Sequence, residues 1–157
     1  MKIICVIPAR YASTRLPGKP LADIAGKPMI VRVYERVLNA IKPAEVIAAV
    51  DDERVYEAVV KAGAKPLMTA KNHPTGTDRL AEVAQKCPDA DVIINVQGDE
   101  PLIEPQIIDD LAQEFLNDEN LKMATVKTPM KEEEKAKPGN VKVITCLLYT
   151  SDAADDK

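Results

Sequence analysis

Short runs rich in valine and isoleucine alternate along this chain with longer segments whose apolar residues recur at helical spacing. Such alternation is typical of a parallel α/β sheet with helical crossovers. The first run, residues 3–7, is apolar throughout, as a strand buried on both faces requires. Because parallel crossovers are right-handed, we expect an open doubly wound, mostly parallel sheet with helices on both faces. The predicted strands are residues 3–7, 46–50, 65–68, 91–96, 124–126 and 141–145.

Helix boundaries can be assigned from punctuating residues between these runs. Pro28 is expected to open the first helix, where its missing N–H costs no hydrogen bond. Gly63 is expected to end the second, and Thr75 or Thr77 to start the third as an N-cap. The predicted helices lie at about residues 28–38, 55–63, 78–86 and 105–115, with a solvated helical turn at 132–134.

The composition excludes several classes of protein. The 157 residues, 46% hydrophobic and 29% charged, fit one globular domain. With 21 basic against 25 acidic residues and no block of basic residues, the sequence lacks the excess of positive charge that is typical of proteins that bind nucleic acid. No apolar run approaches the ~18 residues of a membrane span. We therefore expect a cytoplasmic chain with no nucleic-acid partner and no membrane insertion.

The cysteines and the single histidine give no sign of a metal centre. Cys5, Cys87 and Cys146 are an odd number at unrelated spacings, which suits neither a disulfide framework nor a zinc site. Cys5 is expected in the core of the first strand and Cys87 at a helix end. His73 is interpreted as a loop side chain.

A long cationic loop follows the first strand, at the carboxyl edge where open parallel sheets bind ligands. Residues 8–21 contain Arg10, Arg15 and Lys19 together with three prolines. Guanidinium forks, a lysine charge and backbone N–H groups can bind several phosphates. Lys19 is followed by proline rather than by serine or threonine, so this is not a P-loop. The alternative is a surface loop that the prolines stiffen.

A second polar segment follows the strand predicted at residues 91–96. Gln97, Gly98 and Asp99 come directly after this strand. A carboxylate beside phosphates suits a hard cation, and Mg²⁺ is the natural inference. The alternative is that Gly98 and Asp99 only form a turn. Because the strands at 3–7 and 91–96 can be neighbours at a switch point, a site shared with the cationic loop is favoured.

Two further segments leave alternatives open. Thr75 and Thr77 lie where hydroxyl groups could bind a base or sugar, or could only cap a helix. Asp51 and Asp52 follow the second strand and open a helix. Stabilisation of the helix dipole explains them, although Asp51 could also face a ligand.

Taken together, these motifs closely resemble those of the 3-deoxy-manno-octulosonate (Kdo) cytidylyltransferases, the CMP-Kdo synthetases. The resemblance runs from residue 1 to about residue 145, and several motifs agree in order. Sialic acid cytidylyltransferases have a similar first loop but do not usually combine it with the other runs. The resemblance is carried by Ile7-Pro8-Ala9-Arg10, Arg15-Leu16-Pro17-Gly18-Lys19-Pro20-Leu21, Gly26-Lys27-Pro28-Met29-Ile30, Gly76-Thr77-Asp78-Arg79 and Val96-Gln97-Gly98-Asp99-Glu100-Pro101.

This resemblance implies a Rossmann-like nucleotidyltransferase fold and the transfer of CMP from CTP to Kdo, with release of pyrophosphate, for lipopolysaccharide synthesis. It implies catalytic roles for Arg10, Lys19 and Asp99, with Mg²⁺ on Asp99. It further implies that Gln97 faces the Kdo. The nucleotide-binding residues that it implies are Pro8, Ala9, Arg10, Ser13, Arg15, Lys19, Gly76, Thr77, Asp78 and Arg79.

The chain also departs from this family. Its members are longer, and their later part supplies a second metal-binding aspartate, much of the Kdo pocket and the dimer interface. We therefore expect residues 1–145 to be the CTP-binding part of a C-terminally truncated domain, and the intact protein to be a homodimer. Residues 146–157 resemble a translated sequencing adapter and are expected to be a non-native tail. Two alternatives stay open: an inactive nucleotide-binding fragment, or a cytidylyltransferase for another sugar acid such as sialic acid.

Overall fold

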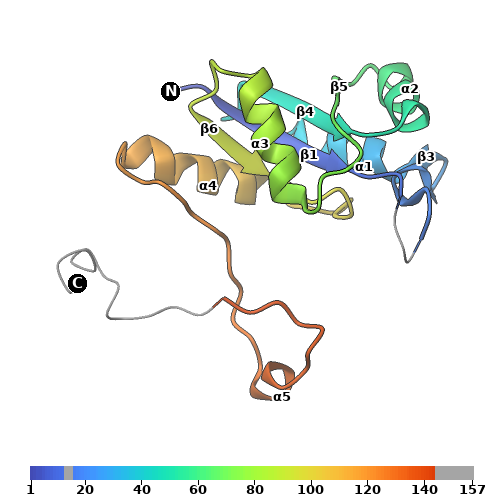
Figure 1. The fold of residues 1–157 in the computed structure, drawn as a ribbon. Coiled ribbons are helices and arrows are strands. Elements are labelled where there is room, and N and C mark those ends of the chain that lie inside the picture. Colours follow the sequence, from blue (N-terminus) through green and yellow to red (C-terminus); the bar gives the residue numbers. More distant parts are fainter. Residues whose placement is uncertain (13–15, 144–157) are drawn as a thin grey trace. The chain divides into compact units, whose positions relative to one another are not determined.

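The computed structural model describes residues 1–12 and 16–143 and divides the chain into two units, Met1–Ala124 and Thr125–Lys157 (Figure 1). Among the described residues, no helix has the length and apolar character that crossing a membrane demands. The elements in chain order are β1 (Ile3–Ala9), η1 (Lys19–Leu21), β2 (Asp23–Ile24), β3 (Lys27–Pro28), α1 (Met29–Val37), β4 (Glu45–Val50), α2 (Glu53–Lys61), β5 (Pro66–Met68), α3 (Gly76–Lys86), β6 (Val92–Asn95), α4 (Pro105–Asn117) and α5 (Glu132–Lys135).

A four-stranded parallel sheet in the order β5-β4-β1-β6 forms the centre of the first unit. The chain passes from β1 outward to β4 and β5, and then returns to the other side of β1 to form β6. The direction of winding therefore reverses between β1 and β6. This confirms the predicted open doubly wound sheet and places the switch point beside the two polar segments identified in the sequence.

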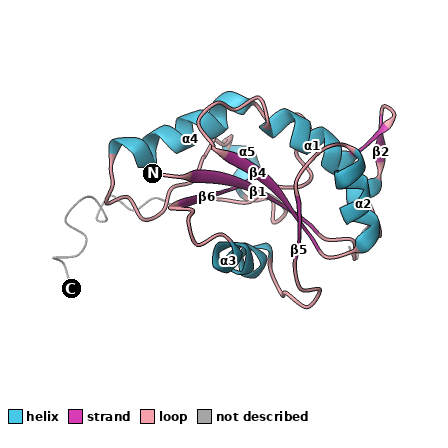
Figure 2. Cartoon of the chain, turned by 90° about the horizontal axis from the view of Figure 1, so that it is seen from above, coloured by secondary structure: helices cyan, strands magenta, loops and turns pink. Residues whose placement is uncertain are grey.

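Helices cover both faces of this sheet, as Figure 2 shows: α1, α2 and α4 lie on one face and α3 on the other. A right-handed return from β5 to β6 requires its helix on the face opposite α1 and α2. Successive β1 side chains alternate between two cores. Ile3, Cys5 and Ile7 pack with the three-helix face, and Ile4 and Val6 pack with the α3 face.

The predicted helix boundaries are confirmed to within a few residues. Pro28 lies one residue before α1, and Gly63 follows α2 with a φ of 72°. The sequence reading did not predict the β2–β3 hairpin. Its two turn residues, Ala25 and Gly26, have φ values of 50° and 82°, which is the backbone conformation of a tight two-residue hairpin turn.

Two predicted strands are wrong. Residues 124–126 and 141–143 form no strand, while residues 144 and 145 lie outside the described part of the chain. A short apolar run becomes a strand only when a neighbouring backbone receives its hydrogen bonds. Within residues 1–12 and 16–143, β6 pairs with β1 alone, and neither run pairs with it. The helical turn predicted at 132–134 is confirmed as α5.

Candidate functional site

The cationic loop and the acidic segment meet at the carboxyl edge of the sheet. Lys19 Nζ lies 2.5 Å from Asp99 Oδ2, although the two residues are 80 positions apart. Lys19 belongs to η1, which closes the loop after β1, and Asp99 follows β6. Both side chains are partly exposed, at 37% and 49%. The structure therefore gathers one cation and one carboxylate at a surface that a charged ligand can reach.

Close approach between the ends of β1 and β6 depends on Gly98. A Cβ atom at this position would lie 2.6 Å from the carbonyl oxygen of Pro8. Two residues earlier, the Val96 N–H donates to the Val6 carbonyl at 3.0 Å, so the segment stays against β1 after the strand has ended. Glycine here brings Gln97 and Asp99 beside the start of the cationic loop.

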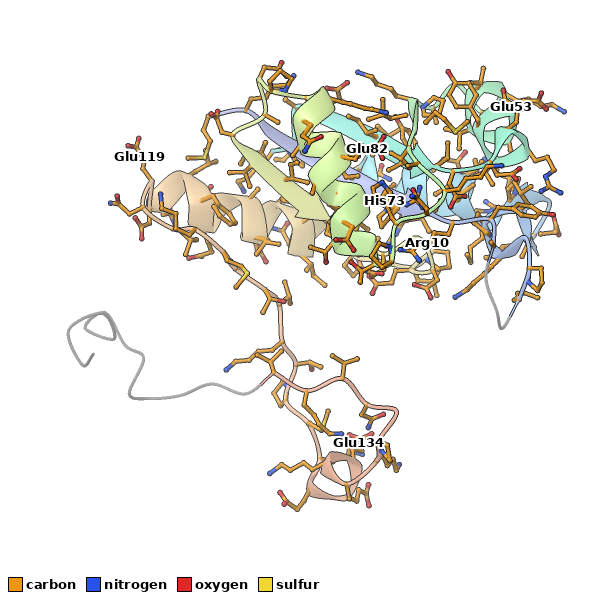
Figure 3. All side chains as sticks on the ribbon, viewed as in Figure 1. Arg10, Glu53, His73, Glu82, Glu119 and Glu134 are labelled. Carbon is orange, nitrogen blue, oxygen red and sulfur yellow. The ribbon has the colours of Figure 1, made fainter. Side chains whose placement is uncertain are left out.

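Arg10 links the cationic loop to the segment before α3. Its Nη1 donates to the carbonyl of Pro74 at 3.3 Å, and Figure 3 labels Arg10 together with His73 and Glu82. Its Nη2 is buried and has no hydrogen-bond partner among the described residues. A buried guanidinium N–H without an acceptor suits an anionic ligand.

Arg79, which the resemblance implies to be a nucleotide-binding residue, is buried in this structure. Its side chain is 0% exposed, with Nη2 2.8 Å from Asp51 Oδ2. Its Nη1 donates to Thr69 Oγ1. Burial lowers the pKa of Arg79, while Asp51 acts in the opposite direction and favours the charged guanidinium. The structure thus holds the two terminal nitrogens of Arg79 by a charged and a neutral acceptor, while its Nε is buried with no hydrogen-bond partner among the described residues.

Tyr11 fixes the base of the cationic loop. The Tyr11 N–H donates to Asp51 Oδ1 at 2.9 Å, and its carbonyl accepts from the Gly18 N–H at 2.9 Å. Gly18 has a φ of 72°, which favours glycine at this turn. The Arg54 guanidinium carbon lies 3.6 Å from the centroid of the Tyr11 ring, a cation–π contact. Both described ends of the loop are therefore anchored.

The start of α3 is set by a capping box. Thr75 Oγ1 accepts from the Asp78 N–H at 3.2 Å, and Asp78 Oδ2 accepts from the Thr75 N–H at 2.9 Å. The hydrogen bond from the Thr75 side chain contributes most to lowering the pKa of Asp78. Of the two threonines predicted as caps, Thr75 is the N-cap, and Thr77 lies exposed in the first turn.

His73 belongs to an ionic cluster that ties the preceding loop to α3. Its Nε2 lies 2.5 Å from Glu82 Oε2, and the same oxygen accepts from the Ala70 N–H at 2.9 Å. Glu82 Oε1 pairs with Lys86 at 2.7 Å. Hydrogen bonds from Lys86, His73 and the Ala70 amide lower the pKa of Glu82 to about 2. His73 is therefore a loop side chain with a structural contact.

The other residues implied by the resemblance occupy the same edge or lie outside the described part. Pro8 and Ala9 end β1, Gln97 is exposed beside Asp99, and Gly76 begins α3. The structure does not describe Ser13, Arg15 or the predicted tail at 146–157. Sequence reasoning missed Thr69 and the anchoring role of Tyr11. The position of Asp51 at a strand end was the only signal for its role.

The candidate donor for a divalent metal at this site is the Asp99 carboxylate. Among residues 1–12 and 16–143, no group of three or more His, Cys, Asp or Glu side chains could hold a metal ion. Mg²⁺ is often held by one or two carboxylates together with substrate phosphates. The oxygen donor of Asp99, beside a cationic loop, fits such a shared site.

Comparison with known proteins identifies the family of this chain. The cytidylyltransferase family model matches residues 4–150. A 3-deoxy-manno-octulosonate cytidylyltransferase from Geobacter metallireducens is 55% identical over 146 residues, which are 92% of this chain and 57% of that protein. The enzyme of that name from Escherichia coli is 51% identical over 143 residues, 91% of this chain and 58% of that protein. The chain thus spans a little over half the length of these relatives.

Solved structures show the same fold. CMP:2-keto-3-deoxy-manno-octonic acid synthetase complexed with CTP is similar with a TM-score of 0.75 and 54% identity, over 77% of this chain and 50% of that one. A cytidylyltransferase from Leptospira borgpetersenii gives a TM-score of 0.68 and 27% identity, over 76% of this chain and 51% of that one. The family match covers most of the sequence. This chain belongs to the cytidylyltransferase family.

Proposed function

We propose that this chain is the nucleotide-binding part of an enzyme that transfers CMP from CTP to Kdo, giving CMP-Kdo and pyrophosphate. The observation that carries the proposal is the pairing of Lys19 with Asp99, because it joins a phosphate-binding cation to a carboxylate suited to a metal. The names of the similar proteins support CTP and Kdo as the substrates. A role in lipopolysaccharide synthesis, a cytoplasmic location and a homodimer of the intact protein stay predictions.

In this reaction the anomeric hydroxyl of Kdo attacks the α-phosphorus of CTP in line with the departing pyrophosphate. Catalysis then depends on positioning and on neutralising phosphate charge. Arg10 would donate its unpartnered Nη2 to a phosphate oxygen. Lys19 would exchange Asp99 for phosphate oxygens when CTP binds. No covalent intermediate with the protein is needed.

The remaining residues would hold the substrates and the metal. Asp99 would hold Mg²⁺, which when bound would offset phosphate charge and favour ionisation of the attacking hydroxyl. Gln97, exposed beside it, would face the Kdo. Gly76 and Thr77 would place the first turn of α3 near the cytidine, where N–H groups at a helix N-terminus can donate.

Two parallel assays test this function. Pyrophosphate release would be measured with the 157-residue chain, CTP, Kdo and Mg²⁺, and CTP binding would be measured by calorimetry. Release that depends on Kdo supports the transferase. Release with N-acetylneuraminate but not with Kdo would assign another sugar acid. CTP binding without turnover would identify an inactive nucleotide-binding part, a candidate that the short length relative to the curated relatives favours.

A lysine pair provides a matched control for the phosphate-binding role. Lys19 and Lys27 each follow a glycine and precede a proline, and each forms an ion pair at 2.5 Å. We expect Lys19→Ala to weaken CTP binding by about 10- to 100-fold, because a hydrogen bond to a charged group contributes ~1.5–3 kcal/mol. Lys27→Ala, on the hairpin, should bind CTP like the unmodified chain. Equal losses in both variants would refute the assignment.

Asp99→Ala tests the metal-binding role proposed for this residue. In an intact version of the protein, a folded Asp99→Ala variant should lose most turnover while its circular dichroism stays unchanged. Near wild-type pyrophosphate release by this variant would remove Asp99 as the metal ligand.

A further inference from the structure

A buried polar network lies directly beneath the candidate site. The carboxylate of Asp51, 5% exposed, accepts the Tyr11 N–H on Oδ1 and the Arg79 guanidinium on Oδ2, at 2.9 and 2.8 Å. Arg79 also donates to Thr69 Oγ1, and that hydroxyl donates to the Val50 carbonyl at 2.8 Å. The network therefore connects the cationic loop, the ends of β4 and β5, and the first turns of α3.

Each end of the network contacts a segment that, in the proposed function, binds part of CTP: the cationic loop at one end and the start of α3 at the other. Tyr11 directly follows Arg10, and its carbonyl accepts the N–H of Gly18 beside Lys19. Arg79 lies in α3 one turn beyond Gly76. Arg10 adds a second connection between the same two segments through the Pro74 carbonyl. A shift of Asp51 would therefore displace both the phosphate-binding and the cytidine-binding segments.

We propose that Asp51 and Arg79 are a positioning pair that holds the cationic loop and the start of α3 in the spacing required for CTP. The identity of the ligand rests on the function proposed above. Arg79 acts through Asp51 and Thr69 rather than by touching the nucleotide, because its side chain has no exposed surface.

The chemistry of the aspartate explains why this residue type is needed. A carboxylate offers two acceptor oxygens, and here one binds a backbone N–H while the other binds a guanidinium. Asparagine has one acceptor oxygen and an NH₂ group that cannot accept. Asp51→Asn must therefore give up one of the two partners. We expect the Tyr11 N–H to lose its acceptor, because the charged Arg79 guanidinium holds the single remaining oxygen more strongly than a neutral N–H does.

A buried aspartate elsewhere provides the matched control. Asp109 of α4 is also 5% exposed and accepts the backbone N–H groups of Ile41 and Lys42, away from the candidate site. CTP affinity in Mg²⁺ and hydrogen exchange of the Tyr11 amide would be measured for Asp51→Asn and Asp109→Asn. We expect Asp51→Asn to weaken CTP binding at least tenfold and to speed Tyr11 exchange at least tenfold. Asp109→Asn should change each by less than twofold.

A double variant separates positioning from stability. Asp51→Asn combined with Arg79→Met leaves no unpaired buried charge, so its urea midpoint should recover toward that of the unmodified chain. Its CTP affinity should stay as weak as that of Asp51→Asn, because Tyr11 and α3 are still not joined. Recovery of affinity together with stability would show that the pair is only structural.

The remaining outcomes also decide the matter. CTP binding by Asp51→Asn within twofold of the unmodified chain, or equal losses in Asp109→Asn, would overturn the positioning role. If the unmodified chain binds no CTP, the proposed function fails for this chain. Tyr11 exchange then still decides the pair: acceleration in Asp51→Asn alone supports its hold on the loop, and unchanged exchange overturns it.

Discussion

Single atoms decide whether the two polar segments can meet. The clearest case at the scale of one residue is Gly98, where an added Cβ would lie 2.6 Å from the Pro8 carbonyl oxygen. That carbonyl belongs to the backbone near the end of β1, so it cannot rotate away as a side chain could. By contrast, an added Cβ at Gly76 would meet no heavy atom within 4 Å.

We therefore predict opposite outcomes for alanine at these two glycines. Gly98→Ala should lower the free energy of unfolding by about 1–3 kcal/mol, the usual cost of forcing an atom into a packed interior. Gly76→Ala should be neutral or slightly stabilising, because alanine favours helix more than glycine does. Urea unfolding followed by circular dichroism measures both. A Gly98→Ala protein as stable as the unmodified chain would contradict the close approach.

At the scale of one element, the N-terminus of α3 shows how local chemistry orients a site. Residues before the helix are held by the Thr75–Asp78 capping box and by the contacts of Glu82 with His73 and the Ala70 amide. These contacts fix where the first turn of α3 begins, and hence where Gly76 and Thr77 present their N–H groups.

Two threonines in this turn give a matched prediction. Thr75→Ala should cost about 1 kcal/mol of unfolding free energy, because it removes the side-chain acceptor of an N-cap. Thr77→Ala should change it by less than about 0.5 kcal/mol, as for most exposed substitutions. Chemical denaturation of the two variants under one set of conditions compares them. Equal losses of unfolding free energy in the two variants would show that Thr75 is not the sole N-cap of α3.

At the scale of the whole molecule, the packed interior is confined to the first unit. All buried hydrophobic side chains among the described residues lie between Ile3 and Ala112. The described part of the second unit, residues 125–143, contributes no side chain to this set, and its Val126 and Val141 are exposed. The free energy that orders the sheet therefore comes from residues before Ala124.

This distribution predicts the result of truncation. A chain ending at Ala124 should fold and should unfold at the same urea concentration as the 157-residue chain, because no buried apolar area is lost. The measurement is a pair of urea titrations followed by circular dichroism. Failure of the shorter chain to fold, or a clearly lower midpoint, would show that later residues stabilise the sheet.

Local sequence patterns were sufficient to predict several strands and helix ends. The apolar run of β1, the proline before α1 and the glycine after α2 each act through their own backbone, so they could be interpreted without a tertiary structure. Strand alternation with helices also predicted the sheet class. Residues 124–126, Ala-Thr-Val, were also predicted as a strand but form none, because pairing depends on a partner that composition does not specify.

Sequence by itself determined the parallel sheet, the helix boundaries and the two polar segments at its carboxyl edge, because these follow from periodicity and from the handedness of crossovers. Only the tertiary structure decided which charges meet. It paired Lys19 with Asp99 at the surface and buried Arg79 against Asp51. The physical reason is that an ion pair between residues far apart in the sequence depends on the order of the strands and the packing of the helices. The residues next to each partner in the sequence do not specify that arrangement.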